Sequence, residues 1–256
     1  MNLRKAFQRW RQRQKIVLTD LTAVPLQFVT QSPVERYRIA QYGEERDSLL
    51  YFLQQLHPDD VLFDIGASVG LYAAAAATQL TQGHLYAFEP DPETMDALKQ
   101  NIALNKLSNV SFLPWAVSDE DGEITLFSDG VAGRAPTLAK QSRPHAPEGT
   151  ISVPKSTLDG AIARGELPVP TVLKMDIEGA EILALRGCKG LLNGRFQQRP
   201  RLIMLEIHPL FLPDFGATAE ETKAILTDAG YTLIWELLRH DQEHLCYVAD
   251  AGGGLE

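Results

Sequence analysis

The stretch VLFDIGASVG, residues 61–70, decides the fold of this chain. An apolar run ends in an acid and a Gly-x-x-x-Gly turn, and the alanine-rich residues 71–77 follow. This order predicts a buried strand, a tight turn and a helix, in which the glycines let the backbone approach a ligand closely. A nucleotide-like cofactor suits such a corner, although an ordinary strand-to-helix turn has the same pattern.

Composition limits the classes of protein. A chain of 256 residues, 45% hydrophobic and 22% charged, is long enough to bury one α/β core with extensions. The net charge of −9 disfavours nucleic acid as a partner, because phosphate binding relies on basic residues. Cys188 and Cys246 lack the spacing of a zinc site or a disulfide framework, which predicts buried thiols in a reducing compartment.

The chain divides into three parts by pattern. Residues 1–57 precede the first core strand as an N-terminal extension, residues 58–250 hold the α/β domain, and residues 251–256 are a glycine-rich tail of the kind that cloning adds. No apolar run reaches the length of a transmembrane helix and no signal-peptide core follows the basic start, so we expect a cytoplasmic protein. The oligomeric state cannot be predicted from these features.

The first 15 residues carry six basic side chains and no acid. Leu3, Phe7 and Trp10 recur at helical spacing, which predicts a basic amphipathic helix. Such a helix can dock on the acidic body of the protein or lie on an anionic membrane surface, and docking is the favoured interpretation.

A second strand ends in an acid. Residues 84–90 read HLYAFEP, and Glu89 lies 25 positions after Asp64. In Rossmann-like folds, an acid at the tip of the second strand binds the hydroxyls of a ribose. The alternative is a solvated acid at a strand end.

The middle of the chain is less regular. Residues 116–127 predict a hairpin with Asp121-Gly122 as its turn. Residues 128–156 are rich in glycine and proline, which predicts a long surface loop, either a lid over the site or disorder.

Polar side chains end two later strands. Residues 171–176 and 202–209 are strand-like, and Asp176, Glu206 and His208 lie at their carboxyl ends, where open α/β sheets bind ligands. Two further strands, residues 231–238 and 244–248, are expected to close the sheet with an antiparallel edge strand.

Four blocks together resemble the FkbM-type S-adenosylmethionine-dependent methyltransferases. They read FDIGASVG (63–70), AFEP (87–90), AVSD (116–119) and KMDIEGAE (174–181), and their order and spacing match that family. The resemblance covers about residues 40–250, and the last block is the most specific.

The resemblance implies a Rossmann-like class I methyltransferase fold, with a seven-stranded, mostly parallel sheet and helices on both faces. It also implies that the corner at 64–70 cradles the methionine part of S-adenosyl-L-methionine, that Glu89 binds the ribose, and that the segment after the third strand lies by the adenine. The residues expected to bind the cofactor are Asp64, Gly66, Ala67, Ser68, Gly70, Glu89, Pro90, Ser118 and Asp119.

The acid before the turn separates this site from a dinucleotide site. A nicotinamide dinucleotide places its pyrophosphate on a G-x-G-x-x-G turn, and a carboxylate such as Asp64 would repel it. Asp64 suits a ligand with an ammonium group, which S-adenosylmethionine has. A nicotinamide-dependent oxidoreductase is therefore the less favoured alternative.

Asp176, His208 and Glu206 are the candidate catalytic residues. Methyl transfer to an alcohol needs alignment of the reactants and removal of one proton, so each of the three is a candidate base. A divalent cation bound by the three is a second hypothesis, which is not favoured because Lys174 lies on the same strand face and is expected to pair with Glu206 or Asp176. Glu178 and Glu181 are expected to cap the following helix.

The function predicted from the sequence is O-methylation (EC 2.1.1.-) of a hydroxyl on a small molecule or glycan, the substrate class that the resemblance implies. N-methylation with the same cofactor site is the nearest alternative. The other alternative is a module that binds the cofactor without catalysing a reaction.

Overall fold

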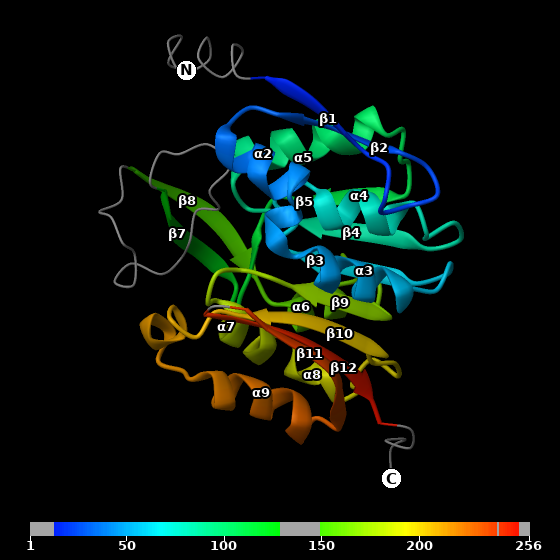
Figure 1. Ribbon diagram of the computed structural model, residues 1–256. Coiled ribbons are helices and arrows are strands. Elements are labelled where there is room, and N and C mark those ends of the chain that lie inside the picture. Colours follow the sequence, from blue (N-terminus) through cyan, green and yellow to red (C-terminus); the bar gives the residue numbers. More distant parts are fainter. Residues whose placement is uncertain (1–12, 129–148, 240, 251–256) are drawn as a thin grey trace.

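The computed structural model describes residues 13–128, 149–239 and 241–250. Its centre is a seven-stranded sheet with the strand order β11-β12-β10-β9-β3-β4-β5 (Figure 1). The strands are β3 (Val61–Ile65), β4 (His84–Phe88), β5 (Val110–Leu113), β9 (Val172–Met175), β10 (Leu202–Ile207), β11 (Tyr231–Arg239) and β12 (Gln242–Ala249). Neighbours from β5 to β10 pair in parallel, whereas β12 is antiparallel to both β10 and β11. This sheet confirms the fold class expected from the sequence, with the antiparallel pair at one edge.

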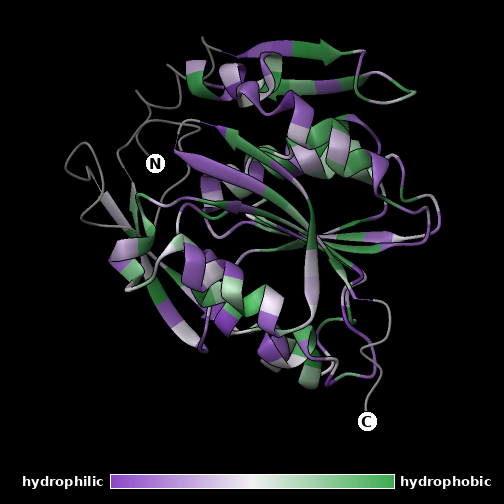
Figure 2. Ribbon diagram, turned by 60° about the horizontal axis from the view of Figure 1, so that its bottom comes forward, coloured by the Kyte–Doolittle hydropathy of each residue, from purple (hydrophilic) through white to green (hydrophobic). Residues whose placement is uncertain are grey.

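Helices cover both faces of the sheet. The helices above it in Figure 1 are α3 (Arg46–Gln54), α4 (Leu71–Ala77) and α5 (Pro92–Leu104), and those below are α6 (Leu158–Ala163), α7 (Glu181–Arg186), α8 (Lys189–Leu192) and α9 (Ala219–Asp228). Successive residues of β3 face opposite sides, so Leu62 packs into the core on the α4 side and Phe63 into the core on the α7 side. Figure 2 shows hydrophobic and hydrophilic residues alternating along several helices around the sheet, whereas every residue of α4 is buried.

The N-terminal extension packs on the helix layer that contains α5. It forms β1 (Gln14–Leu18), β2 (Leu26–Thr30), α2 (Pro33–Ala40) and a short 3-10 helix, η1 (Tyr42–Glu44). The side-chain oxygens of Asn101 and Asn105 on α5 each accept a hydrogen bond of 2.8 Å from the backbone of β2, and Phe28 is fully buried in the core of the α4 side. The extension therefore packs against the helices on one face of the sheet, and it extends to the edge where the parallel strands have their carboxyl ends.

The predicted amphipathic helix falls mostly outside the described residues. Residues 1–12 are not described, and residues 14 and 15 already belong to β1. Membrane or body contact of that segment stays a prediction. The tail at 251–256 also lies outside the described residues.

The hairpin predicted for residues 116–127 is wrong. A small sheet holds β6 (Ala116–Val117), β8 (Gly149–Ser156) and β7 (Gly122–Ser128) in that order, so β8 separates the two strands that were expected to pair. Asp121 explains the difference, because its side chain accepts hydrogen bonds from the backbone N–H of Thr157 and the hydroxyl of Ser156, at the end of β8. The segment expected to be one long loop therefore ends in a strand, and residues 129–148 are not described.

The burial expected of the two cysteines is also observed. Cys188 and Cys246 are both buried and free. No helix in the described ranges has both the length and the apolar character needed to cross a membrane. A further 3-10 helix, η2 (Leu212–Phe215), joins β10 to α9.

Candidate active site

The glycine corner after β3 is held against two other strand ends. The backbone N–H groups of Gly66 and Ala67 donate to the carbonyl of Phe88 at 3.0 and 2.9 Å. Gly66 has φ +83°, and a Cβ there would lie 1.9 Å from the carbonyl oxygen of Asp176. Only glycine allows both the conformation and the close approach, so the corner after β3 and the end of β9 form one rigid unit.

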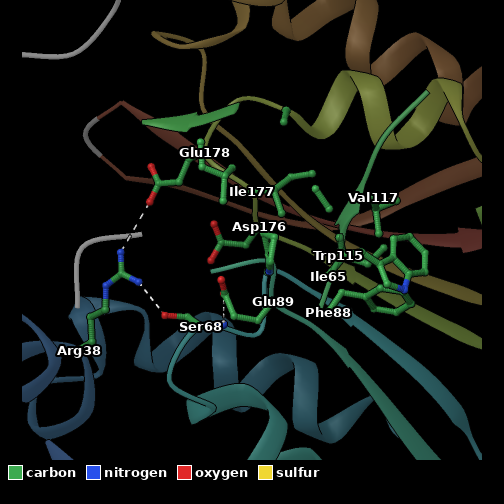
Figure 3. Close-up of a pocket in the computed structure, with 15 residues that line it drawn as sticks. Arg38, Ile65, Ser68, Phe88, Glu89, Trp115, Val117, Asp176, Ile177 and Glu178 are labelled. Atoms are coloured by element: carbon green, nitrogen blue, oxygen red, sulfur yellow. Dashed lines mark hydrogen bonds and ion pairs between the residues drawn. The ribbon is translucent and has the colours of Figure 1, made fainter. Parts of the chain in front are cut away.

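A first cavity of about 640 Å³ opens beside this corner (Figure 3). Four of the residues expected to bind the cofactor line it, namely Gly66, Ser68, Glu89 and Pro90. Its inner wall is apolar and aromatic, because Trp115 stands edge-on to Phe88 with ring centroids 4.9 Å apart. Sequence reasoning did not select Trp115, since an aromatic residue after a strand has no distinctive spacing.

Glu89 is a buried acid at the tip of β4, as its position in the sequence predicted. One carboxylate oxygen accepts the backbone N–H of Asp91 at 2.9 Å and the other accepts that of Ser68 at 3.1 Å. Burial raises the pKa of Glu89 to about 7, even though these two hydrogen bonds act in the opposite direction. The backbone thus fixes the orientation of a carboxylate that keeps free lone pairs for a ligand.

The other predicted cofactor residues lie elsewhere in the corner or beneath it. Ala67 lines a second cavity, described below. Gly70 is the N-cap of α4, in a left-handed conformation. Asp64, Ser118 and Asp119 are described residues that line neither cavity, and Ser118 is fully buried under Gly187. The wall after β5 is formed instead by Ala116 and Val117.

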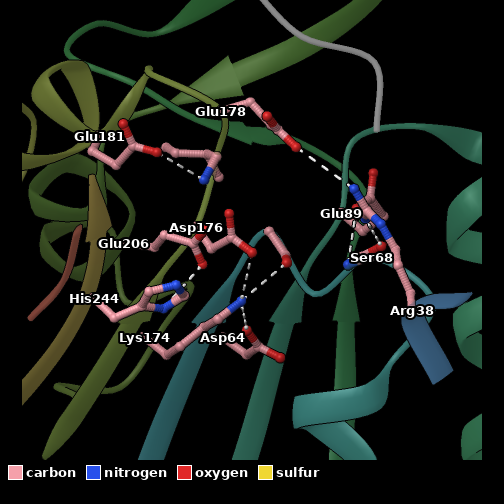
Figure 4. A network of polar contacts seen from close by, with 12 residues as sticks. Arg38, Asp64, Ser68, Glu89, Lys174, Asp176, Glu178, Glu181, Glu206 and His244 are labelled. Carbon is pink, nitrogen blue, oxygen red and sulfur yellow. Dashed lines mark hydrogen bonds and ion pairs between the residues drawn. The ribbon is translucent and has the colours of Figure 1, made fainter. Parts of the chain in front are cut away.

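Asp64 pairs with a lysine of the next strand. The register of β3 and β9 sets Asp64 opposite Lys174, whose Nζ lies 3.2 Å from Asp64 Oδ1 and 3.7 Å from Asp176 Oδ2 (Figure 4). Burial raises the pKa of Asp64 in spite of the lysine. The pKa of Lys174 is also raised, because Asp64 and Asp176 outweigh the opposing effect of burial. The expected pairing of Lys174 with Asp176 is present, and Asp64 is the nearer partner.

The three candidate catalytic residues meet in a second cavity of about 560 Å³. Asp176 directly follows β9, Glu206 is the next-to-last residue of β10, and His208 directly follows that strand. Each offers one ligand atom, and these atoms lie within 4.8 Å of one another. The two cavities share Arg38, Gly66, Ser68, Asp176 and Glu178, so Asp176 and Glu178 are the carboxylates that border both.

Glu181 orients His208 from below. Its Oε1 lies 3.0 Å from His208 Nδ1 and also accepts the backbone N–H groups of Ile177 and Gly179 at 3.1 Å each. Glu181 therefore fixes the loop before α7 from the first turn of that helix, but the capping expected of it is not observed, because its side chain bonds residues that precede the helix. Glu178 also differs from that expectation, because it precedes the helix with φ +56° and lines both cavities.

The carboxylates of the second cavity differ in charge state. Burial raises the pKa of Glu206 well above its usual range, and Asp176 and Glu45 add to the effect. The pKa of Asp176 is lowered, because Lys174, His208 and Arg38 outweigh burial. Asp176 is therefore the ionised carboxylate at the junction of the two cavities, ready to accept a proton or to bind a cation.

Three residues of the extension complete the site and were missed by sequence reasoning. Arg38 on α2 donates to Ser68 Oγ at 2.9 Å and lies 3.6 Å from Glu178 Oε1 (Figure 3). Tyr42 and Glu45 line the second cavity beside it. Nothing in the spacing of residues 36–45 marks them, because their role depends on how the extension folds onto the sheet.

Fold and site together define a Rossmann-like α/β protein with a cofactor-sized cavity next to a cavity rich in acids, both at the carboxyl edge of the sheet. The model of the methyltransferase FkbM domain family matches residues 64–233, which is more than half of the chain. The chain belongs to this family and is a methyltransferase, as the resemblance implied.

Several curated relatives are similar along much of their length. The hexuronic acid methyltransferase AglP of Haloferax volcanii is 26% identical over 227 residues, which span 89% of this chain and 86% of that protein. The 31-O-demethyl-FK506 methyltransferase FkbM of Streptomyces tacrolimicus is 25% identical over 208 residues, 71% of this chain and 76% of that protein. The 2-O-methyltransferase NoeI of Sinorhizobium fredii is 28% identical over 148 residues, 53% and 60% respectively.

Proposed function

We propose that this chain transfers a methyl group from S-adenosylmethionine to a hydroxyl of a sugar or another polyhydroxylated small molecule. The observation that carries the proposal is the junction of the two cavities, where Asp176 borders both the cavity that holds Glu89 and the cavity that holds Glu206 and His208. A cofactor in the first and an acceptor in the second would meet at this carboxylate.

The first cavity fits S-adenosylmethionine by its chemistry. The buried Glu89 carboxylate can accept hydrogen bonds from two ribose hydroxyls, and the wall of Phe88 and Trp115 suits an adenine. The acids near the corner favour a ligand that carries positive charge, and the cofactor has a sulfonium and an ammonium. Asp64 would act on it through Lys174 and the local field, since its carboxylate lies under the corner.

The residues at the junction would position the acceptor and take its proton. When bound, S-adenosylmethionine supplies a methyl group that an oxygen nucleophile displaces in line from sulfur. The acceptor hydroxyl would give its proton to Asp176 or to another group that lines the second cavity. This proton transfer would accompany formation of the oxygen–carbon bond and breaking of the carbon–sulfur bond. His208 and Glu206 line the acceptor side of this junction, and Arg38 lines both cavities.

The acceptor class is inferred from the polar cavity and from the relatives. The second cavity presents carboxylates and an imidazole, which can hydrogen-bond several hydroxyls at once. The relatives include proteins named for a hexuronic acid and for 2-O-methylation. The names of these relatives favour a sugar hydroxyl over an amine acceptor.

A binding and transfer experiment tests the function. We expect S-adenosylhomocysteine to raise the melting temperature of the chain, and NAD to leave it unchanged. With a labelled methyl donor, the chain should label a glycan or polyol fraction, and mass spectrometry should place the added methyl on oxygen. Label on nitrogen, or stabilisation by NAD alone, would contradict the proposal.

The affinity for S-adenosylhomocysteine should rise with pH through the titration of Glu89. The pKa of this carboxyl is raised to about 7, and the ionised form is the better acceptor for ribose hydroxyls. Because the affinity follows the ionised fraction, calorimetry should show it about tenfold higher at pH 8 than at pH 6. Glu89→Gln should remove most of this pH dependence and weaken binding, whereas the exposed Asp96→Asn should change neither. An unchanged pH dependence in Glu89→Gln would assign the titration to another group.

A further inference from the structure

His208 presents an unsatisfied nitrogen to a group of carboxylates. Its side chain is 4% exposed, and Nε2 has no hydrogen-bond partner among the described residues. That nitrogen lies 3.4 Å from Glu206 Oε1, 3.8 Å from Asp176 Oδ1 and 3.8 Å from Glu178 Oε2. These separations exceed the usual length of an N–H···O hydrogen bond, so the buried nitrogen points at three carboxylates without bonding any of them.

The separations suit ligands that share one ion. Two atoms that each lie about 2.1 Å from a metal ion are about 3.0 Å apart at a right angle, about 3.4 Å apart at the tetrahedral angle and at most about 4.2 Å apart on opposite sides of the ion. His208 Nε2 lies 3.4 Å from Glu206 Oε1 and 3.8 Å from Asp176 Oδ1, and both separations fall within this range. These atoms are therefore too far apart for hydrogen bonds and close enough to coordinate a common ion.

The support around His208 is that of a metal ligand. A metal-binding histidine commonly donates its other ring N–H to a carboxylate, which fixes the tautomer and turns the free lone pair toward the ion. Glu181 is such a carboxylate, 3.0 Å from Nδ1, and the backbone of Ile177 and Gly179 fixes it in turn. On the other ligand, Glu206 Oε2 lies 3.5 Å from His244 Nδ1, which leaves Oε1 facing His208.

Charge also favours a cation in this place. The permanently charged cations around the second cavity are Lys174 and Arg38, and the imidazoles of His208 and His244 lie among them. The carboxylates around them are Asp64, Asp176, Glu178, Glu206 and Glu45. This excess of acids is unfavourable in a buried site unless a further cation or bound protons compensate it.

We propose that Asp176, Glu206 and His208 form a site for a divalent cation of the Mn²⁺ type, with Glu181 as the residue that positions His208. Two carboxylate oxygens and one imidazole nitrogen suit this kind of ion, and three protein ligands leave coordination positions open toward the second cavity. The sequence alone favoured ion pairing with Lys174 over a metal. In the structure Lys174 is held chiefly by Asp64, which leaves Glu206 and His208 available.

The site gives the ion a role in the proposed methyl transfer. An acceptor hydroxyl that occupied an open coordination position would have its pKa lowered, which eases loss of its proton. This role rests on the proposed function, whereas the binding of the ion rests only on the geometry of the three ligands.

Titration with Mn²⁺ tests the site directly. The full chain is stripped with a chelator, and loss of the free Mn²⁺ signal in electron paramagnetic resonance reports binding. We expect one Mn²⁺ per chain, with affinity at least about tenfold weaker in Glu206→Gln and His208→Gln and about 10 to 100-fold weaker in Glu181→Gln. Glu166→Gln removes an exposed carboxylate paired with Arg164 and should bind like the wild type. Glu206→Gln preserves shape, so it remains informative if His208→Gln fails to fold.

Two results would overturn the metal site. One is the absence of saturable binding by the wild type, and the other is equal binding by the wild type and Glu206→Gln, which would mean adventitious ions on surface acids. Methyl transfer by the chelated chain would reject the role of the ion and leave the proposed function intact. Conversely, Mn²⁺ bound by a chain that does not bind S-adenosylhomocysteine would support the site and reject the function.

Discussion

Lys174→Met should lower the free energy of unfolding by about 3 to 5 kcal/mol at pH 7. The lysine lies 3.2 Å from Asp64, whose side chain is 1% exposed and accepts no hydrogen bond from the described residues. Removing Lys174 leaves this carboxylate buried without a counterion. Urea unfolding followed by circular dichroism measures the loss.

A second substitution separates the charge effect from packing. Asp64→Asn combined with Lys174→Met removes both charges and should recover most of the lost stability, since neutralising both partners of a buried pair costs much less than removing one. Lys223→Met is the matched control, because the pair of Lys223 with Glu243 is more exposed and should contribute at most about 1 kcal/mol. If the double variant were as unstable as Lys174→Met, the lysine would act through its contact with the Tyr72 ring, 4.9 Å away, rather than through charge.

Asp176→Asn should lower kcat by a factor of about 10² to 10⁴ while the affinity for S-adenosylhomocysteine stays nearly unchanged. A positioned base contributes about this much to proton transfer, and the amide keeps the shape of the carboxylate but cannot accept the proton. Glu89, which we propose binds the ribose, accepts its hydrogen bonds from the backbone of Ser68 and Asp91 and not from Asp176. Steady-state kinetics with the acceptor found by mass spectrometry, together with calorimetry, measures the two effects.

The comparison of variants tests the position of Asp176 at the junction. Asp214→Asn changes a carboxylate of η2 that lines neither cavity and should keep the wild-type rate. A rate for Asp176→Asn within a few-fold of the wild type would assign the base elsewhere, with His208 as the next candidate. Weakened binding of the cofactor product with an unchanged rate would instead place Asp176 on the cofactor side.

The fold and the two strand-end acids were predictable because each leaves a local pattern. The run before Gly66 marked a buried strand, and the distance from Asp64 to Glu89 marked a second strand tip, so these strands and the acid at the tip of β4 followed from periodicity and spacing, whereas the burial of that acid was not predicted. Asp176, Glu206 and His208 were placed together because parallel strands end at the same edge. Their roles, and those of the cofactor residues, remain predictions.

Features that depend on contacts between strands far apart in the sequence were harder to predict from the sequence. The shared face of Lys174 and Asp176 was predicted, but Asp64 becomes the nearer partner only because β3 lies beside β9 in the register of the sheet. The Asp121-Gly122 turn has the composition of a hairpin turn. The side chain of Asp121 nevertheless accepts hydrogen bonds from the end of β8. Arg38 reaches the site through the docking of α2, which no local pattern encodes.

The contribution of the extension bears on how acceptor choice can change. Arg38, Tyr42 and Glu45 line the second cavity and precede residue 64, where the match to the family model begins. Exchange of residues 13–57 would therefore remodel one wall of that cavity while the corner, Glu89 and Trp115 stay in place. In this architecture, a leading segment supplies part of the wall of the proposed acceptor cavity, and its replacement is a route to new acceptors provided that the contact of residue 38 with Ser68 is kept.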